Sequence, residues 1–138
     1  MASDKKPVVL WIEDKLDSLM KEVAKYLKET GKYDLRSAST VMEARKAIEE
    51  GGKDIALVLL DIIIPVGIER IQNVQEMMEA GIHLYRAYLK KLGIPVVVLT
   101  CRDDDAAQRA FVDEVGVRML FKPVFPDEVE KAIDEALG

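Results

Sequence analysis

The sequence has one cysteine, no long apolar run and no excess of positive charge, and each shortage excludes a class of protein. Because Cys101 is the only cysteine, no internal disulfide is possible, which fits a reducing compartment, and we expect its side chain in the core. The longest apolar stretch, residues 55–64, is interrupted by Asp61 and is far too short to span a membrane.

The charge balance and the first residues also narrow the possibilities. Lysine and arginine number 20 against 25 aspartates and glutamates, for a net charge of -5. Direct nucleic-acid binding is not expected, since it depends on a cationic surface. Residues 1–6 contain no signal peptide before the first apolar run, so the cytoplasm is the expected location.

What is present is the composition of an ordinary globular domain. Apolar residues make up 49% of the 138 residues and charged residues 33%, with no low-complexity segment. This length suits one domain, residues 1–138, with a single core.

Apolar runs rich in β-branched residues alternate with amphipathic helical patterns along the chain. The expected strands cover residues 8–12, 33–38, 55–60, 95–99 and 117–121. The expected helices include 15–30, 40–50, 103–115 and 126–137. The second strand is the more polar one, which suggests an edge, whereas the third is apolar on both faces. This alternation predicts a parallel sheet covered by helices on both sides, a three-layer α/β sandwich.

Polar side chains follow four of the five expected strands. Parallel strands all end at one edge of a sheet, where ligands bind, so these residues are expected to lie close together. They are Glu13, Asp14, Asp61, Thr100 and Lys122. Crowded carboxylates must take up protons, pair or bind a cation, and oxygen ligands favour Mg²⁺. A carboxylate, a metal, a hydroxyl and an ammonium together suit phosphoryl transfer, with Asp61 as nucleophile at the end of a buried strand.

Four separated motifs, in order, resemble the response-regulator receiver family, and the resemblance covers nearly the whole chain. They are residues 9–14 with Glu13-Asp14, residues 57–65 with Asp61 and Pro65, residues 97–100 ending in Thr100, and Phe121-Lys122-Pro123. The resemblance implies a flavodoxin-like five-stranded parallel sheet in the order 2-1-3-4-5. It also implies that the chain accepts a phosphoryl group from a histidine kinase or phosphotransfer protein, and catalyses only its own phosphorylation and dephosphorylation.

The resemblance also implies a role for each matching position. Asp61 is the phosphoacceptor, Thr100 the switch hydroxyl, and Lys122 the partner of a phosphoryl oxygen. The implied Mg²⁺ ligands are Glu13, directly or through water, Asp14, Asp61 and the backbone carbonyl of Ile63. The bond into Pro123 is expected to be cis. The switching surface would comprise the last two helices and the strand between them, with a monomer or weak dimer formed through that surface.

Two features depart from the family pattern. Met119 stands three residues before Lys122, where the family usually has an aromatic residue that moves with the threonine. The segment 66–80 is an insertion of about a dozen residues relative to the family's usual loop; its apolar spacing predicts an additional helix between Gly67 and Gly81, ahead of a third helix near His83. That helix either covers the site, or offers Met77 and Met78 to a partner, or is only a longer connection.

Three other functions fit less well. An aspartate-nucleophile phosphatase of the haloacid dehalogenase class needs a second aspartate two residues after the nucleophile, where this chain has Ile63. A nucleotide or flavin site needs a glycine-rich or hydroxyl-rich turn, whereas the turn after the first strand is acidic. A phosphorylation-independent adaptor on the receiver fold would be expected to lack Asp61 or Lys122, and both are present.

Overall fold

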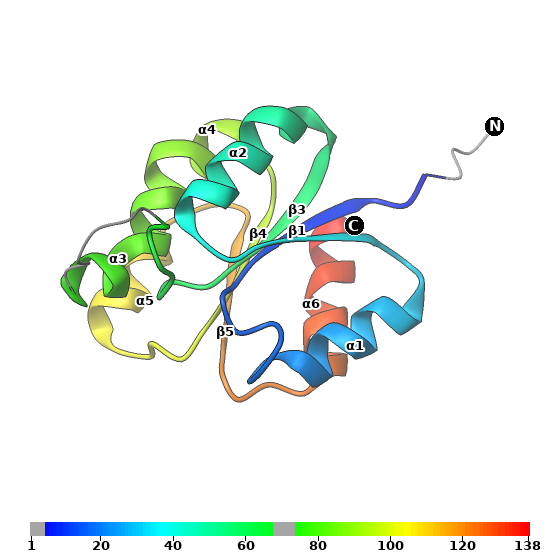
Figure 1. Ribbon diagram of the computed structural model, residues 1–138. Helices are drawn as coiled ribbons and strands as arrows, with labels where there is room; N and C mark the ends of the chain where they lie inside the picture. Colours follow the sequence, from blue (N-terminus) through cyan, green and yellow to red (C-terminus); the bar gives the residue numbers. More distant parts are fainter. Residues whose placement is uncertain (1–4, 68–73) are drawn as a thin grey trace.

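The computed structural model of the protein describes residues 5–67 and 74–138. They contain a five-stranded, all-parallel sheet in the order β2-β1-β3-β4-β5, drawn in Figure 1. The strands are β1 (Val8–Ile12), β2 (Asp34–Ala38), β3 (Ile55–Leu60), β4 (Val96–Thr100) and β5 (Val117–Phe121). The predicted fold class and strand order are therefore confirmed, and the strand bounds differ from those expected by one residue at most.

Helices cover both faces of the sheet (Figure 1). The helices are α1 (Lys21–Thr30), α2 (Val41–Gly51), α3 (Val74–Leu84), α4 (Lys90–Leu92), α5 (Asp105–Phe111) and α6 (Pro126–Leu137). A 3₁₀ turn, Gly52–Asp54, precedes β3, and a π-helical turn, Tyr85–Leu89, joins α3 to α4. Within the described residues, none of these helices has the length and apolar character needed to cross a membrane.

Alternate residues of the central strands build two separate cores. Val9, Trp11, Leu57 and Leu59 belong to the core under α1 and α6. The residues between them on β1 and β3, such as Leu10 and Val58, belong to the core shared with α2, α3 and α5. Because β1, β3 and β4 are buried on both faces, the sheet fixes where their carboxyl ends lie, whereas β2 is a mostly exposed edge strand as expected.

Two helices are shorter than their apolar patterns predict. Instead of beginning near Lys15, α1 begins at Lys21, and Leu19, expected on its buried face, is 81% exposed. The Lys15 N–H donates to Glu13 Oε2 at 3.2 Å, and the N–H of Met20 turns back to the Lys15 carbonyl at 2.9 Å. These bonds hold residues 15–20 in turns, so that the helix can begin only after them.

The helix α5 ends at Phe111 instead of Val115. Lys90 Nζ lies 2.8 Å from Glu114 Oε1, and the Glu114 N–H returns to the Phe111 carbonyl, which turns the chain away from the helical path. Val115 is consequently exposed. Cys101, in the loop before α5, is also exposed, so its expected place in the core is wrong.

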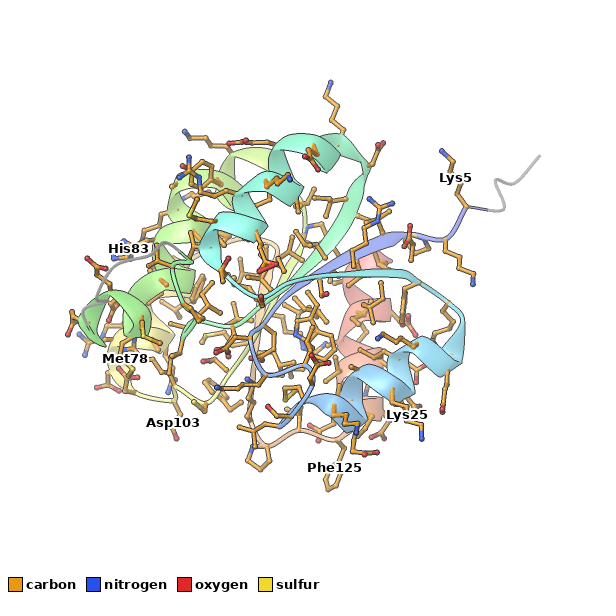
Figure 2. All side chains as sticks on the ribbon, in the orientation of Figure 1. Lys5, Lys25, Met78, His83, Asp103 and Phe125 are labelled. Carbon is orange, nitrogen blue, oxygen red and sulfur yellow. The ribbon has the colours of Figure 1, made fainter. Side chains whose placement is uncertain are left out.

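The additional helix predicted between Gly67 and Gly81 is present in part, but it is not a separate element. Of the apolar positions that indicated it, Ile68 and Ile71 lie outside the described residues. Helix α3 begins at Val74 and runs through Gly81, continuing by way of the π-helical turn and α4 to Leu92. His83 therefore lies within α3 and not near the start of a third helix, and its side chain is exposed (Figure 2).

Candidate functional site

The sheet ladder continues one residue beyond three strands and places three charged side chains at one edge. The Glu13 N–H donates to the Ala38 carbonyl at 2.9 Å, and the Asp61 N–H donates to the Ile12 carbonyl at 3.1 Å. The Lys122 N–H donates to the Thr100 carbonyl at 2.8 Å. Backbone hydrogen bonds in a closely packed sheet thus fix the starting point of each side chain.

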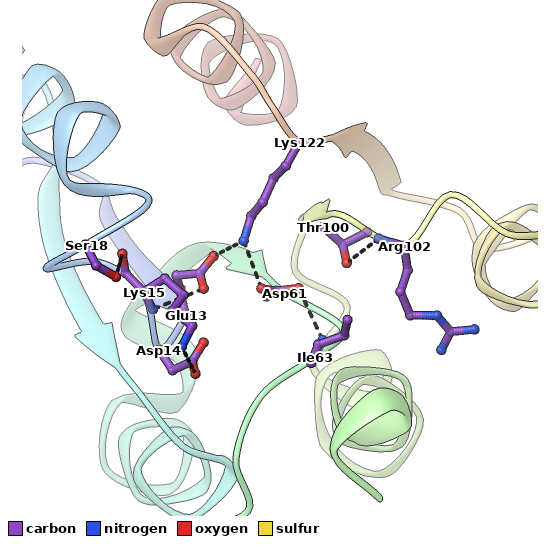
Figure 3. A network of polar contacts seen from close by, with 9 residues as sticks. All are labelled: Glu13, Asp14, Lys15, Ser18, Asp61, Ile63, Thr100, Arg102 and Lys122. Carbon is purple, nitrogen blue, oxygen red and sulfur yellow. Dashed lines mark hydrogen bonds and ion pairs between the residues drawn. The ribbon is translucent and has the colours of Figure 1, made fainter. Parts of the chain in front are cut away.

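Lys122 joins two of the carboxylates. Its Nζ lies 2.9 Å from Asp61 Oδ2 and 2.5 Å from Glu13 Oε1, as the dashed lines in Figure 3 show. Glu13 is 1% exposed and Asp61 3% exposed, so both acids are taken out of water almost completely. Buried carboxylates need such a partner, since an unpaired buried charge is costly.

The pKa values of Glu13 and Lys122 both reflect burial and neighbouring charge. Burial raises the pKa of Glu13 to about 7, the nearby Asp61 charge adds to the rise, and the hydrogen bond from Lys122 works against it. Burial alone would lower the pKa of Lys122, but the charge of Asp61 and the bond to Glu13 outweigh it and raise that pKa above its usual value. The site therefore holds a charged lysine beside a glutamate whose pKa is raised.

The donor set fits a hard divalent cation. One carboxylate oxygen each from Glu13, Asp14 and Asp61 lies within 4.8 Å of the other two. Asp14 is the most accessible of the three and is also 3.5 Å from the Lys15 ammonium. Oxygen ligands of this kind suit Mg²⁺, which keeps several of its waters. A cation there would also offset the repulsion from Asp61 that, after burial, raises the pKa of Glu13.

Thr100 and Ile63 lie beside this cluster with different partners. The Ile63 N–H donates to Asp61 Oδ1 at 3.2 Å, so that both oxygens of Asp61 have a partner. Thr100 is fully buried at the end of β4, and its hydroxyl accepts the Arg102 N–H at 3.2 Å. The structure thus brings Glu13, Asp14, Asp61 and Lys122 together, while the roles of the Ile63 carbonyl and the Thr100 hydroxyl stay predictions.

A cavity of 550 Å³ opens beside Asp61 and Lys122. Its charged lining residues are Asp14, Lys15, Asp61 and Lys122, and the others, mainly apolar, are Leu19, Met20, Val23, Ile63, Met77, Cys101, Pro123 and Val124. The peptide bond between Lys122 and Pro123 is cis, as the resemblance implies. Phe125, at the start of α6, extends into solvent beyond this edge (Figure 2). Asp61 can therefore be approached from outside through a mostly apolar opening.

Sequence reasoning missed two residues that hold the loops of this site. Arg102 is a buried arginine that joins the loop after β4 to α3, and Gly81 packs α3 on the backbone of Asp61. The only signals were an arginine two residues beyond a strand-end threonine and a glycine within an apolar helical pattern. Neither pattern predicts which residues are contacted, because the contacted residues are distant along the chain.

Comparisons with known proteins agree with this geometry. No protein-family model matches the sequence, and no curated protein matches it. Among solved structures, the chain is similar to a response regulator receiver domain protein (CheY-like) from Methanospirillum hungatei, with TM-score 0.72 and 22% identity over 96% of this chain and 94% of that one. It is also similar to a response regulator from Thermotoga maritima, with TM-score 0.71 and 20% identity over 96% and 98% of the two chains.

A third similar structure is a two-component response regulator from Clostridium difficile, with TM-score 0.71 and 20% identity over 96% of each chain. At these identities the likeness establishes the fold. The chain has the fold of response-regulator receiver domains, so the resemblance found in its motifs is confirmed at that level. The acidic cluster of Glu13, Asp14 and Asp61 fits the phosphorylation site of such a domain.

Proposed function

We propose that this protein is a phosphoacceptor receiver domain of a two-component phosphorelay, and that Asp61 carries the phosphoryl group. The observation that supports this most is the setting of Asp61. It is a buried carboxylate 2.9 Å from the Lys122 ammonium, with Glu13 and Asp14 oxygens within 4.8 Å and an open cavity beside it. A structural ion pair would not require two further carboxylates at the same place.

In the proposed reaction, an oxygen of Asp61 attacks the phosphorus of a phosphohistidine, the nitrogen–phosphorus bond breaks, and an aspartyl phosphate forms. Lys122 holds a positive charge next to that oxygen, and the Ile63 N–H orients the carboxylate. A Mg²⁺ ion held by Glu13, Asp14, Asp61 and the Ile63 carbonyl would offset negative charge on the phosphoryl oxygens. The chain would catalyse only its own phosphorylation and dephosphorylation.

The output follows from the new charge on Asp61. The Thr100 hydroxyl, which accepts the Arg102 N–H, would turn toward the phosphoryl group and bias the domain between two states. The surface of α5, β5 and α6 would report that change and form any weak dimer. Met119, the residue in place of the family's aromatic, is only partly buried against the core next to α5. The phosphodonor would be a histidine kinase or phosphotransfer protein in the cytoplasm.

The test is phosphorylation by a small acyl phosphate with Mg²⁺, read by intact-protein mass. We expect the wild-type protein to gain one phosphoryl group and Asp61→Asn to gain none. Asp103→Asn is the matched control, because it removes an exposed aspartate from the loop after β4 and leaves the acidic cluster intact. Labelling of Asp61→Asn at the wild-type level would remove Asp61 from the role given to it.

A further inference from the structure

Helix α3 packs directly on the loop that carries Asp61. The Gly81 N–H donates to the Ile62 carbonyl at 2.8 Å. A Cβ atom at position 81 would lie 2.2 Å from the Asp61 carbonyl oxygen and 2.6 Å from the Ile62 Cα, closer than real contacts allow. Only glycine permits this approach, so α3 and the backbone of the phosphoacceptor cannot move far without each other.

Arg102 holds the same helix from the loop after β4. Its Nη1 donates to the Met78 carbonyl at 2.8 Å and to Glu79 Oε1 at 3.0 Å. Its Nε and Nη2 donate to the two carboxylate oxygens of Asp104 at 2.9 and 2.7 Å. The side chain is 9% exposed, and Figure 3 shows the guanidinium pointing away from Asp61. A buried arginine with bidentate hydrogen bonds fixes the position of α3 relative to the loop after β4, in addition to balancing charge.

The backbone of Arg102 is in turn bonded to the hydroxyl proposed to switch. The Arg102 N–H donates to Thr100 Oγ1 at 3.2 Å, and this hydrogen bond is buried. One residue therefore contacts Thr100 through its main chain and α3 through its side chain. If the hydroxyl turns toward a phosphoryl group, the Arg102 N–H loses its acceptor and the guanidinium is carried with the backbone.

We propose that Arg102 couples the Thr100 hydroxyl to the first half of α3, so that phosphorylation of Asp61 changes how firmly residues 75–81 are held. This inference rests on the proposed function, but it adds an output element on the opposite face of the sheet from α6. Arg102 is the coupling element, because it contacts Thr100 and Asp104 within its own loop and Met78 on α3. Position 119 is Met in this sequence and not the aromatic residue that usually moves with the threonine. Helix α3 offers a separate element that could respond to Thr100.

The coupling is measured by amide hydrogen exchange of α3, first without any phosphoryl analogue. Thr100→Ala removes the acceptor of the Arg102 N–H, whereas Thr100→Ser keeps it. We expect Thr100→Ala to speed exchange in residues 75–81 by about five-fold, the loss of roughly one hydrogen bond, and Thr100→Ser to match the wild-type protein. Unchanged α3 exchange in Thr100→Ala, with the Arg102 amide itself altered, would overturn the coupling while leaving the proposed function intact.

The second arm adds Mg²⁺ and beryllofluoride, with binding followed by fluorine NMR. We expect binding to change α3 exchange in the wild-type protein by about the same factor, and to leave it unchanged in Arg102→Gln. Arg109→Gln is the matched control, since Arg109 is exposed and pairs with Asp105 on its own helix. If beryllofluoride binds and α3 exchange changes in Arg102→Gln as much as in the wild-type protein, the coupling alone is rejected. If beryllofluoride does not bind the wild-type protein, the proposed function is rejected and the inference with it.

Discussion

At the scale of single residues, the charged groups around Asp61 fall into two sets with different duties. Lys122 bonds both Glu13 and Asp61 at the edge of the sheet, while Arg102 and Asp104 bond each other beside α3. The first set holds charge out of water at the proposed phosphorylation site. In the second set Arg102 is buried and Asp104 is half exposed, and their ion pair orders the loop after β4.

The Arg102–Asp104 pair can be tested by titration. Hydrogen bonds from Arg102 lower the pKa of Asp104 from 3.8 to about 2. Since the lowered pKa favours the folded state when Asp104 is ionised, this contribution is complete above the unfolded value near 4 and disappears as the pH falls to about 2. We expect carbon NMR of the Asp104 carboxyl to give a midpoint of about 2, rising toward 3.8 in Arg102→Gln. A wild-type midpoint at the ordinary value would show that the two groups are not bonded in solution.

At the scale of elements, the predictable parts are those that the sheet dictates. Apolar runs alone predict where β1, β3, β4 and β5 end. Parallel pairing then brings the polar residues at these ends, Glu13, Asp61, Thr100 and Lys122, to one edge of the sheet. Helix ends were less predictable. The start of α1 depends on the bond from Lys15 to Glu13, and the end of α5 on the pairing of Glu114 with Lys90. Such contacts leave no periodic trace in a sequence, and neither does the bond of Arg102 to Glu79.

The packing of α3 on the Asp61 loop predicts how much a methyl group added at position 81 lowers the stability of the protein. Gly81→Ala would place Cβ against the backbone of Asp61 and Ile62, which cannot give way as a side chain end can. We expect it to lower the free energy of unfolding by about 3 kcal/mol in urea denaturation, with the midpoint moved and the slope unchanged.

Gly51→Ala is the control for this glycine. It lies in the last turn of α2, and a Cβ there would meet only the Ile55 side chain at 3.4 Å, an ordinary contact. We expect this variant to unfold within about 1 kcal/mol of the wild-type protein, with any change toward greater stability. Equal effects of the two substitutions would contradict the close approach of α3 to the Asp61 loop.

At the scale of the whole molecule, cation binding at the acidic cluster would be linked to folding. The three carboxylates are brought together only by the folded sheet, from segments far apart in the sequence. An unfolded chain has no such arrangement of ligands, so a cation that binds the cluster must stabilise the fold. Burial, and after it the charge of Asp61, raises the pKa of Glu13, so a cation at the cluster would offset part of the cost of holding these carboxylates ionised.

Mg²⁺ should therefore raise the thermal stability of the protein, and the size of the effect should depend on Asp14. At a Mg²⁺ concentration 100 times the dissociation constant, linkage predicts about 2.7 kcal/mol of added stability. Asp14→Asn removes one charged ligand, and we expect the thermal midpoint of that variant to respond weakly to the same Mg²⁺ concentrations. Asp17→Asn makes the same change of charge in the turn after β1 without touching the three-carboxylate cluster, so its response should equal that of the wild-type protein. A Mg²⁺ response that survives in Asp14→Asn, or vanishes in Asp17→Asn, would place the cation elsewhere on this acidic chain.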